Sequence, residues 1–312
     1  MTLTPKLDSV HVQVVPTKTL IIGHTGRMGQ MLMAESAAHN LEVVGLDQPF
    51  DQNIDLTNLD LAIFCVPALV LEQVLAKICP ILPSSCIVAD ITSVKELPML
   101  LMERAWGGAV IGTHPLFGPN LNRNEILPVA ITPGQKTTTE ALAKVTGFFT
   151  TLGFTVFRCE AKAHDLAMAS LQNLNFITTL AYFALLAGHE ELLPFLTPSF
   201  RRRMKAAKKM LTEDAPMFSG LFEANNNSNI MVRQYTRYLN LAAAGDIEVL
   251  CQKAKWWWDK VNLEDHLGTD SLGTKTLETN PLGGESQETD PLGPDLQELN
   301  ENQPLNLLDP TD

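Results

Sequence analysis

The chain has few cysteines and no paired cysteine motif. Its five cysteines are Cys65, Cys79, Cys86, Cys159 and Cys251, and none belongs to a CxxC pair. An odd number of scattered cysteines in a chain of 312 residues is typical of reduced thiols, and three of them lie in apolar runs, where cysteine behaves as a small hydrophobic residue. We therefore expect neither a disulfide framework nor a zinc or other metal site.

Long apolar runs are also lacking. No stretch approaches the roughly 20 residues that cross a bilayer. The opening segment, MTLTPKLDSVHVQVVPTKT, lacks the charged-then-apolar order of a signal peptide. We expect a cytoplasmic protein with no membrane partner.

An excess of basic charge is missing as well. The net charge is −12, and residues 263–312 account for most of it with twelve acidic residues and one lysine. The rest of the chain is nearly neutral, with 22 basic and 23 acidic residues. A nearly neutral body offers no electrostatic footprint for nucleic acid, so we exclude that class of partner.

The acidic segment 263–312 contains no aromatic residue and carries an imperfect ten-residue repeat. TDSLG begins at residue 269, TNPLG at 279 and TDPLG at 289. This composition cannot bury enough apolar surface to offset the entropy lost on ordering, so it predicts a disordered tail.

The remaining chain divides into two patterns. After an N-terminal extension at 1–18, short β-branched runs alternate with amphipathic helical stretches over 19–160, which predicts βαβ units around a buried parallel sheet. Residues 161–262 contain no pattern typical of β-strands, and their sequence predicts helices, several of which are apolar over more than one face. Such helices need more partners than a small domain supplies, and we expect a homodimer.

A glycine-rich turn joins the first predicted strand to the first predicted helix. LIIGHTGRMGQ places Gly23, Gly26 and Gly29 there, and glycines at this point let backbone N–H groups approach a pyrophosphate at the helix N-terminus. The arrangement predicts a Rossmann-like dinucleotide site. Thr25, Arg27 and Met28 belong to the same candidate cofactor loop.

Asp47 ends the second predicted strand, 24 residues beyond Gly23. An acid there can accept hydrogen bonds from the adenosine ribose and would repel a 2′-phosphate, which favours NAD over NADP. An exposed strand-end aspartate is the alternative reading. Arg27 argues the other way, because a cation in the loop could help to bind the NADP phosphate.

Later strands end in further candidates. Cys65, Val66 and Pro67 follow one strand and are expected beside the cofactor. The next strand ends in ADITSVK, which carries Ser93, and the one after that ends at His114 in HPLFGP. A lone loop histidine is usually structural, but carboxyl ends of parallel strands meet at one ligand-binding edge of the sheet. That convergence favours a functional role for Ser93 and His114.

The predicted helical half also contains polar residues that are candidates for binding a substrate. Gln172 and Asn173 follow His164 by eight and nine residues, about two turns, which puts the three near one face of a predicted helix. PSFRRRMK begins another helix with three arginines, of which one guanidinium would suit a substrate carboxylate.

In this order, the motifs resemble the prephenate/arogenate dehydrogenase family of tyrosine biosynthesis: GxxGxMG, an acid after strand two, DITSVK, HPLFGP, HD before a long helix, and PSFR. The resemblance covers about Leu20 to Val261. It is closest to the bacterial branch in which the dehydrogenase is often fused behind a chorismate mutase domain. Because only 18 residues precede the first predicted strand, we expect a member without the fused mutase domain. It implies an α/β fold with a Rossmann-like parallel-sheet nucleotide-binding domain, followed by an all-helical dimerisation domain.

The resemblance also implies a reaction and residue roles. The reaction is NAD-dependent oxidative decarboxylation of prephenate, or of arogenate. His114 would accept the ring hydroxyl's proton, with Ser93 in the same hydrogen-bond network. Arg201 would bind a substrate carboxylate, while His164, Gln172 and Asn173 would line the pocket. Many members have SHLPH where this chain has QNLNF (172–176), so two histidines of the family pattern are absent at these positions.

Other classes fit less well. Dihydrodipicolinate reductases share a similar phosphate loop but carry an HHxHK-like segment that is missing here. β-Hydroxyacid dehydrogenases use a lysine in the long helix, and residues 163–188 contain none. A non-catalytic NAD(P)-binding sensor is the alternative from a different class, although a sensor would not need Ser93, His114 and Arg201 together.

Overall fold

The structure of the chain is a computed structural model that describes residues 14–50 and 54–260. The predicted extension at 1–18 is therefore described only from residue 14, and the predicted disordered tail at 263–312 lies outside the described residues. Within the described ranges, no helix is both long enough and apolar enough to span a membrane.

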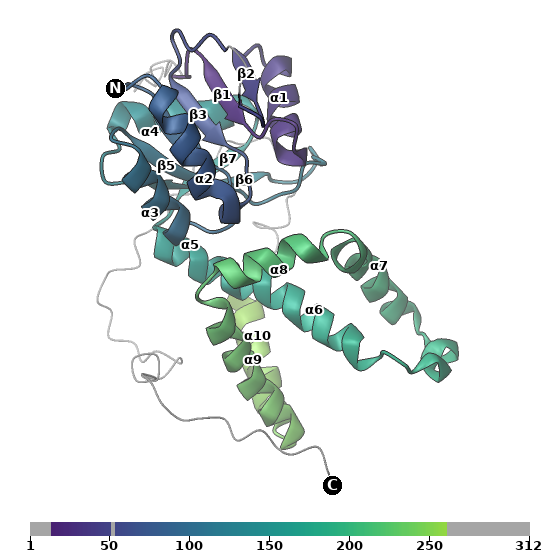
Figure 1. Cartoon of the computed structure of the whole chain (residues 1–312). Coiled ribbons are helices and arrows are strands. Elements are labelled where there is room, and N and C mark those ends of the chain that lie inside the picture. Colours follow the sequence, from purple (N-terminus) through teal and green to yellow (C-terminus); the bar gives the residue numbers. More distant parts are fainter. Residues whose placement is uncertain (1–13, 51–53, 261–312) are drawn as a thin grey trace, which may run out of the picture. The chain divides into compact units, whose positions relative to one another are not determined.

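A seven-stranded sheet, in the order β2-β1-β3-β4-β5-β6-β7, is the centre of the first half of the chain (Figure 1). The strands are β1 (Thr19–Ile22), β2 (Val43–Leu46), β3 (Leu61–Phe64), β4 (Ile87–Asp90), β5 (Val110–Pro115), β6 (Pro128–Pro133) and β7 (Thr155–Arg158). Strands β1 to β5 are parallel, as predicted, whereas β6 is antiparallel to β5 and β7 is parallel to β6.

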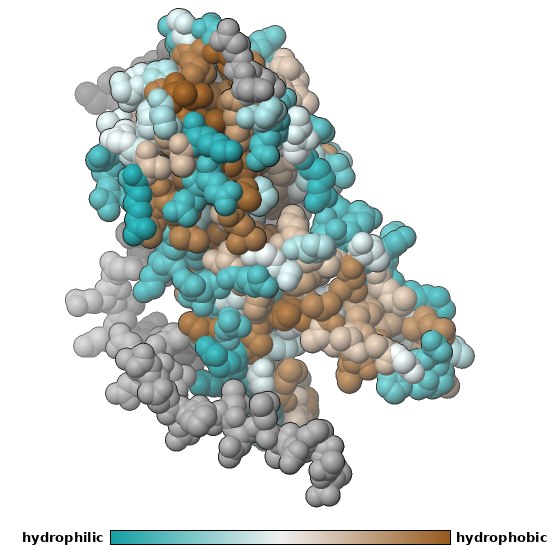
Figure 2. All heavy atoms as spheres, in the orientation of Figure 1, coloured by the Kyte–Doolittle hydropathy of each residue, from teal (hydrophilic) through white to brown (hydrophobic). Residues whose placement is uncertain are grey.

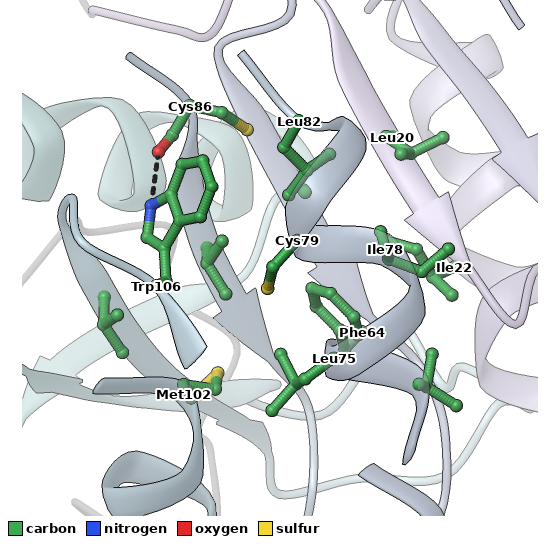
Figure 3. Close-up of a cluster of buried hydrophobic side chains, with 14 of the residues drawn as sticks. Leu20, Ile22, Phe64, Leu75, Ile78, Cys79, Leu82, Cys86, Met102 and Trp106 are labelled. Carbon is green, nitrogen blue, oxygen red and sulfur yellow. Dashed lines mark hydrogen bonds between the residues drawn. The ribbon is translucent and has the colours of Figure 1, made fainter. Parts of the chain in front are cut away.

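Helices cover both faces of this sheet, which explains why its strands are apolar on both sides. On one face, Leu20, Ile22 and Phe64 pack against α2 (Ala68–Ile78), the short 3-10 helix η1 (Cys79–Ile81) and α3 (Glu96–Ala105). Figure 3 shows this cluster, in which the Trp106 indole N–H donates to the carbonyl oxygen of Cys86 at 3.0 Å.

On the other face, alternate residues of the same strands pack against α1 (Arg27–Ala38) and α4 (Thr139–Thr151). The start of α4 is fixed by Thr138, whose hydroxyl accepts a hydrogen bond from Ala141 N at 3.1 Å. The predicted Rossmann-like domain is thus confirmed. Because β2 and β3 lie on opposite sides of β1, the chain reverses its winding direction there, and such switch points bind ligands at the carboxyl ends of the strands.

The second half is helical, as predicted (Figure 1). Its elements are α5 (Ala161–Met168), η2 (Ala169–Asn173), α6 (Leu174–Leu185), η3 (Glu190–Phe195), α7 (Pro198–Thr212), α8 (Ala215–Ala224), α9 (Ser228–Ala243) and α10 (Ile247–Lys260). The π-helical turn η2 directly joins α5 to α6, so these three form one continuous helix, and π-helical turns are frequent at functional sites.

Candidate active site

The turn from β1 into α1 has no room for side chains at two of its glycines. Gly23 has a φ of +84°, and a Cβ on it would lie 2.5 Å from the carbonyl oxygen of Cys65. A Cβ on Gly29 would lie 2.3 Å from the carbonyl oxygen of Gly23. Glycine is therefore required for backbone conformation at the first position and for close packing at the second, as in loops that hold a dinucleotide pyrophosphate.

Asp47, which follows β2, reaches the glycine loop. Its carboxylate accepts hydrogen bonds from the Thr25 hydroxyl and from Thr25 N at 3.2 Å, and from Gln48 N at 2.8 Å. Partial burial disfavours the charged carboxylate, but these hydrogen bonds outweigh it and lower the pKa of Asp47. A negative charge is thus held beside the loop, where the ribose of a dinucleotide would lie.

Arg27, at the start of α1, pairs with an acid from the helical half. Both terminal guanidinium nitrogens of Arg27 lie 3.1 Å from Oδ1 of Asp214, the residue that immediately precedes α8. Lys209 Nζ lies 3.6 Å from the other carboxylate oxygen of Asp214. The charge of Arg27 is therefore compensated within the protein, which the sequence pattern did not reveal.

The remaining predicted cofactor residues surround the same turn. Met28 packs against the core cluster under α1. Cys65 and Val66 are half-buried after β3, and the exposed Pro67 is the N-cap of α2. Gly26 lies between the two constrained glycines, with Gly23 O 3.3 Å from the position of a Cβ.

A fully buried ion pair lies where β4 turns into α3. Lys95 Nζ lies 2.6 Å from Asp90 Oδ2, and both side chains are 0% exposed. Asp90 also accepts hydrogen bonds from the Thr92 hydroxyl, from Thr92 N at 3.0 Å and from Thr113 N at 3.3 Å. Burial lowers the pKa of Lys95, and the charge of Asp90 opposes that effect. The cluster therefore fixes the ADITSVK turn against β5.

Gly112 in β5 explains how a lysine fits there. A Cβ at this position would lie 2.9 Å from Lys95 Cδ and 2.7 Å from Met99 Sδ. The missing side chain of Gly112 thus leaves room for the aliphatic part of Lys95.

His114 lies next to His164, fifty residues later in the chain. His114 is 4% exposed near the end of β5, and its Nδ1 lies 2.9 Å from Nε2 of His164 in α5. The rings meet edge to face, with centroids 5.1 Å apart. Burial, followed by the nearby Lys95 and His164, lowers the pKa of His114 well below its usual 6.5. His114 is therefore neutral at neutral pH, as a proton acceptor must be.

The other predicted substrate residues lie in different surroundings. Ser93 is half-buried in the turn between Asp90 and Lys95. Asn173 Nδ2 donates to Ser228 Oγ at 2.9 Å, tying η2 to α9. By contrast, Gln172 Oε1 is buried with no hydrogen-bond partner among residues 14–50 and 54–260.

Arg201 occupies the first turn of α7. The helix begins at Pro198 after Thr197, whose hydroxyl accepts a hydrogen bond from Phe200 N at 3.2 Å. Arg201 is exposed, and over the described ranges no hydrogen bond or ion pair connects its side chain to the histidines. Arg203 differs from it, because its guanidinium lies 3.8 Å from the ring centroid of Tyr182.

A metal centre is not apparent in the part of the chain that the structure describes, where no three His, Cys, Asp or Glu side chains are grouped to hold an ion. The five cysteines are free thiols.

Comparison with known proteins assigns part of this site to a known type of domain. The nucleotide-binding domain of prephenate dehydrogenase matches residues 30–157, which include Asp47, Ser93 and His114. The T-protein of Enterobacter agglomerans is 27% identical over 250 residues, which are 78% of this chain and 64% of the relative. The probable arogenate/prephenate dehydrogenase of Methanocaldococcus jannaschii is 32% identical over 191 residues, which are 55% of this chain and 42% of the relative.

The chain thus spans less than two thirds of the length of these relatives. A solved structure shares the fold: prephenate dehydrogenase from A. aeolicus in complex with hydroxyphenyl propionate and NAD⁺. It superimposes with a TM-score of 0.64 at 21% identity, over 78% of this chain and 96% of that one. Residues 30–157 thus match the nucleotide-binding domain of the prephenate dehydrogenase family, and the chain is similar in sequence to a T-protein and to a probable arogenate/prephenate dehydrogenase.

Proposed function

We propose that this protein catalyses the NAD-dependent oxidative decarboxylation of prephenate to 4-hydroxyphenylpyruvate in tyrosine biosynthesis, with arogenate as the alternative substrate. The observation that carries the proposal is the buried, neutral His114 at the carboxyl edge of the sheet, in a segment that matches the nucleotide-binding domain of prephenate dehydrogenase. The test is turnover: purified protein is mixed with either substrate and NAD⁺, and NADH formation is followed. Cofactor binding without turnover of either substrate would favour a sensor instead.

The glycine loop and its surroundings fit a dinucleotide. Gly23 and Gly29 leave a cradle that a Cβ would fill, and the ionised Asp47 lies beside it. In the proposed complex, backbone N–H groups of the loop bind the pyrophosphate and Asp47 accepts from the ribose hydroxyls. A dinucleotide held there would supply the hydride acceptor for the ring carbon that carries the hydroxyl.

His114 and Ser93 would act on that hydroxyl. The hydroxyl proton passes to His114 as the C–H bond breaks, so the oxygen becomes a carbonyl. The carboxylate on the opposite ring carbon then leaves as CO₂, and the electron pair of the broken C–C bond makes the ring aromatic. The resulting phenolate oxygen takes the proton back from His114. Ser93 would orient the hydroxyl by a hydrogen bond.

Asp47 predicts the cofactor preference. Asp47→Ser should weaken NAD⁺ binding by roughly 10- to 150-fold, since hydrogen bonds to a charged group contribute about 1.5–3 kcal/mol. It should affect NADP⁺ less, because it also removes the charge that repels the 2′-phosphate. KM values for both cofactors measure this. Wild-type protein that uses NADP⁺ as well as NAD⁺ would contradict the role of Asp47.

Arg201 is proposed to bind a substrate carboxylate. Arg201→Ala should raise the substrate KM about 10- to 150-fold with little change in kcat, because a carboxylate remote from hydride transfer is bound alike in ground and transition states. Arg202→Ala is the matched control and should behave as wild type. Arg203 is a poorer control, since it packs on Tyr182. Equal, small effects at Arg201 and Arg202 would instead indicate a solvated basic face.

Apolar side chains on the helical half support a homodimer. Figure 2 shows apolar surface over these helices, and the side chains of Leu185 and Phe195 are 73% and 77% exposed. Leu193, Leu239 and Trp256–Trp258 are also more than half exposed. Exposed apolar surface of this extent marks an interface in soluble proteins. We propose that residues 161–262 form the substrate and dimerisation domain.

Sedimentation equilibrium should therefore give a dimer, and Leu185→Glu should weaken it. Leu69→Glu is the matched control, because Leu69 is also 73% exposed but lies on α2 beside the sheet. A wild-type monomer, or equal effects of the two changes, would contradict the proposed interface.

A further inference from the structure

We propose that Asp165 and His164 are positioning residues that fix the tautomer of His114, so that its Nε2 is the atom that accepts the substrate proton. This assignment rests on the proposed function for its catalytic meaning, but the hydrogen-bond chain that carries it is a property of the protein alone. It gives His164 a role different from the substrate contact expected from the sequence.

The chain begins at the Asp165 carboxylate, which faces hydrogen-bond donors on both oxygens. Lys95 N donates to Oδ1 at 2.6 Å and Glu96 N donates to Oδ2 at 2.9 Å. These are the first N–H groups of α3, whose positive end favours a negative charge. Lys95, the N-cap residue of α3, has no side-chain acceptor, so Asp165 from α5 supplies the cap that α3 lacks locally. Its carboxylate is held as an acceptor.

An acceptor at Asp165 determines the proton positions on both histidines. His164 Nδ1 lies 2.8 Å from Asp165 Oδ1, so Nδ1 carries the proton and donates it to the carboxylate. In a neutral His164, Nε2 then has the lone pair. It lies 2.9 Å from His114 Nδ1, which must therefore be the donor. The lone pair of neutral His114 is left on Nε2.

Two further observations separate positioning from substrate binding. Both ring nitrogens of His164 are engaged within the protein, and the residue is 3% exposed, so it has no free polar atom for a ligand. Conversely, His114 Nε2 has no hydrogen-bond partner within the described ranges. The free nitrogen of the pair is thus the one on the strand that ends at the ligand-binding edge.

The charges around the pair suit a base that becomes a cation briefly. When Nε2 takes the proton, the imidazolium of His114 donates to His164 from Nδ1, and the Asp165 carboxylate offsets the new charge through His164. The other ionisable groups close to this chain are Lys95, which disfavours the cation, its partner Asp90, and Cys159. No second proton needs to leave the chain during the step.

Nitrogen-15 NMR of the histidine rings tests the tautomers without turnover. We expect wild-type His114 to carry its proton on Nδ1. In His164→Leu, His114 Nδ1 loses its acceptor, so the His114 proton is no longer fixed and should distribute between Nδ1 and Nε2. A proton on Nε2 in the wild type, or unchanged tautomers in the variant, would overturn the proposal even if the protein proved inactive.

Steady-state kinetics test whether the tautomer of His114 affects turnover. Asp165→Asn and His164→Gln should each lower kcat about 10- to 100-fold, the range seen when groups that orient functional histidines are removed, with substrate KM little changed. The matched control is His189→Gln, because His189 Nδ1 has the same 2.8 Å contact to a carboxylate, that of Glu191, on the exposed surface. If His164→Gln instead raised the substrate KM and left kcat unchanged, His164 would be a substrate-binding residue and not a positioning residue. An inactive wild type would count against the proposed function, not against the tautomer.

Discussion

Replacing His114 with Asn is expected to lower kcat about 10²- to 10⁴-fold, the usual contribution of a general base. Asn keeps a polar side chain of similar size but cannot take a proton at neutral pH. The substrate KM should change little, because the lost interaction acts on the proton that moves in the transition state. Steady-state kinetics with the better of the two substrates measures both constants.

The pH profile makes the test of His114 specific. Burial beside Lys95 and His164 lowers its pKa well below 6.5, so the active neutral form persists below that pH. Activity should fall only as the pH drops through this lowered pKa, which places the acid limb of kcat/KM below pH 6.5. His114→Asn should remove that limb. A variant that keeps both the rate and the limb would leave His114 as a packed loop residue.

Replacing Lys95 with Met should lower the free energy of unfolding by about 3–5 kcal/mol. The change keeps most of the apolar volume in the space beside Gly112 but leaves Asp90 as a buried, uncompensated charge. Restoring neutrality with Asp90→Asn in the same chain should recover part of the loss. Urea unfolding of the single and double variants measures both effects.

The matched control is the pair of Lys144 and Asp60, which are 3.1 Å apart but about one fifth exposed. Lys144→Met should lower the free energy of unfolding by no more than about 1 kcal/mol, because water screens that pair. Equal losses for Lys95→Met and Lys144→Met would mean that burial does not distinguish the two pairs.

Local patterns were sufficient to predict much of the fold. Four-residue apolar strands and the glycines of GHTGRMG report on their own backbone, so the parallel strands, the turn into α1 and the helical second half followed from the sequence. The reversed direction of β6 and β7 did not, because PVAITP and FTVFRCE have the same apolar pattern in either direction.

Contacts between distant residues were beyond the sequence pattern. DITSVK placed Lys95 at the edge of the sheet but gave no sign that it is fully buried against Asp90 or that Gly112 leaves it room. The HD motif marked His164 and Asp165, yet only the packing of α5 against α3 and β5 brings Asp165 to the Lys95 N–H and His164 to His114. The pairing of Arg27 with Asp214, 187 residues apart, is of the same kind.

The most direct test of the proposed activity is NADH formation by the purified full chain, measured with prephenate and arogenate, each with NAD⁺ and NADP⁺. The account predicts turnover of at least one of the two substrates, with a higher kcat/KM for NAD⁺ than for NADP⁺. Absence of turnover with both substrates, in protein that binds NAD⁺, would contradict it.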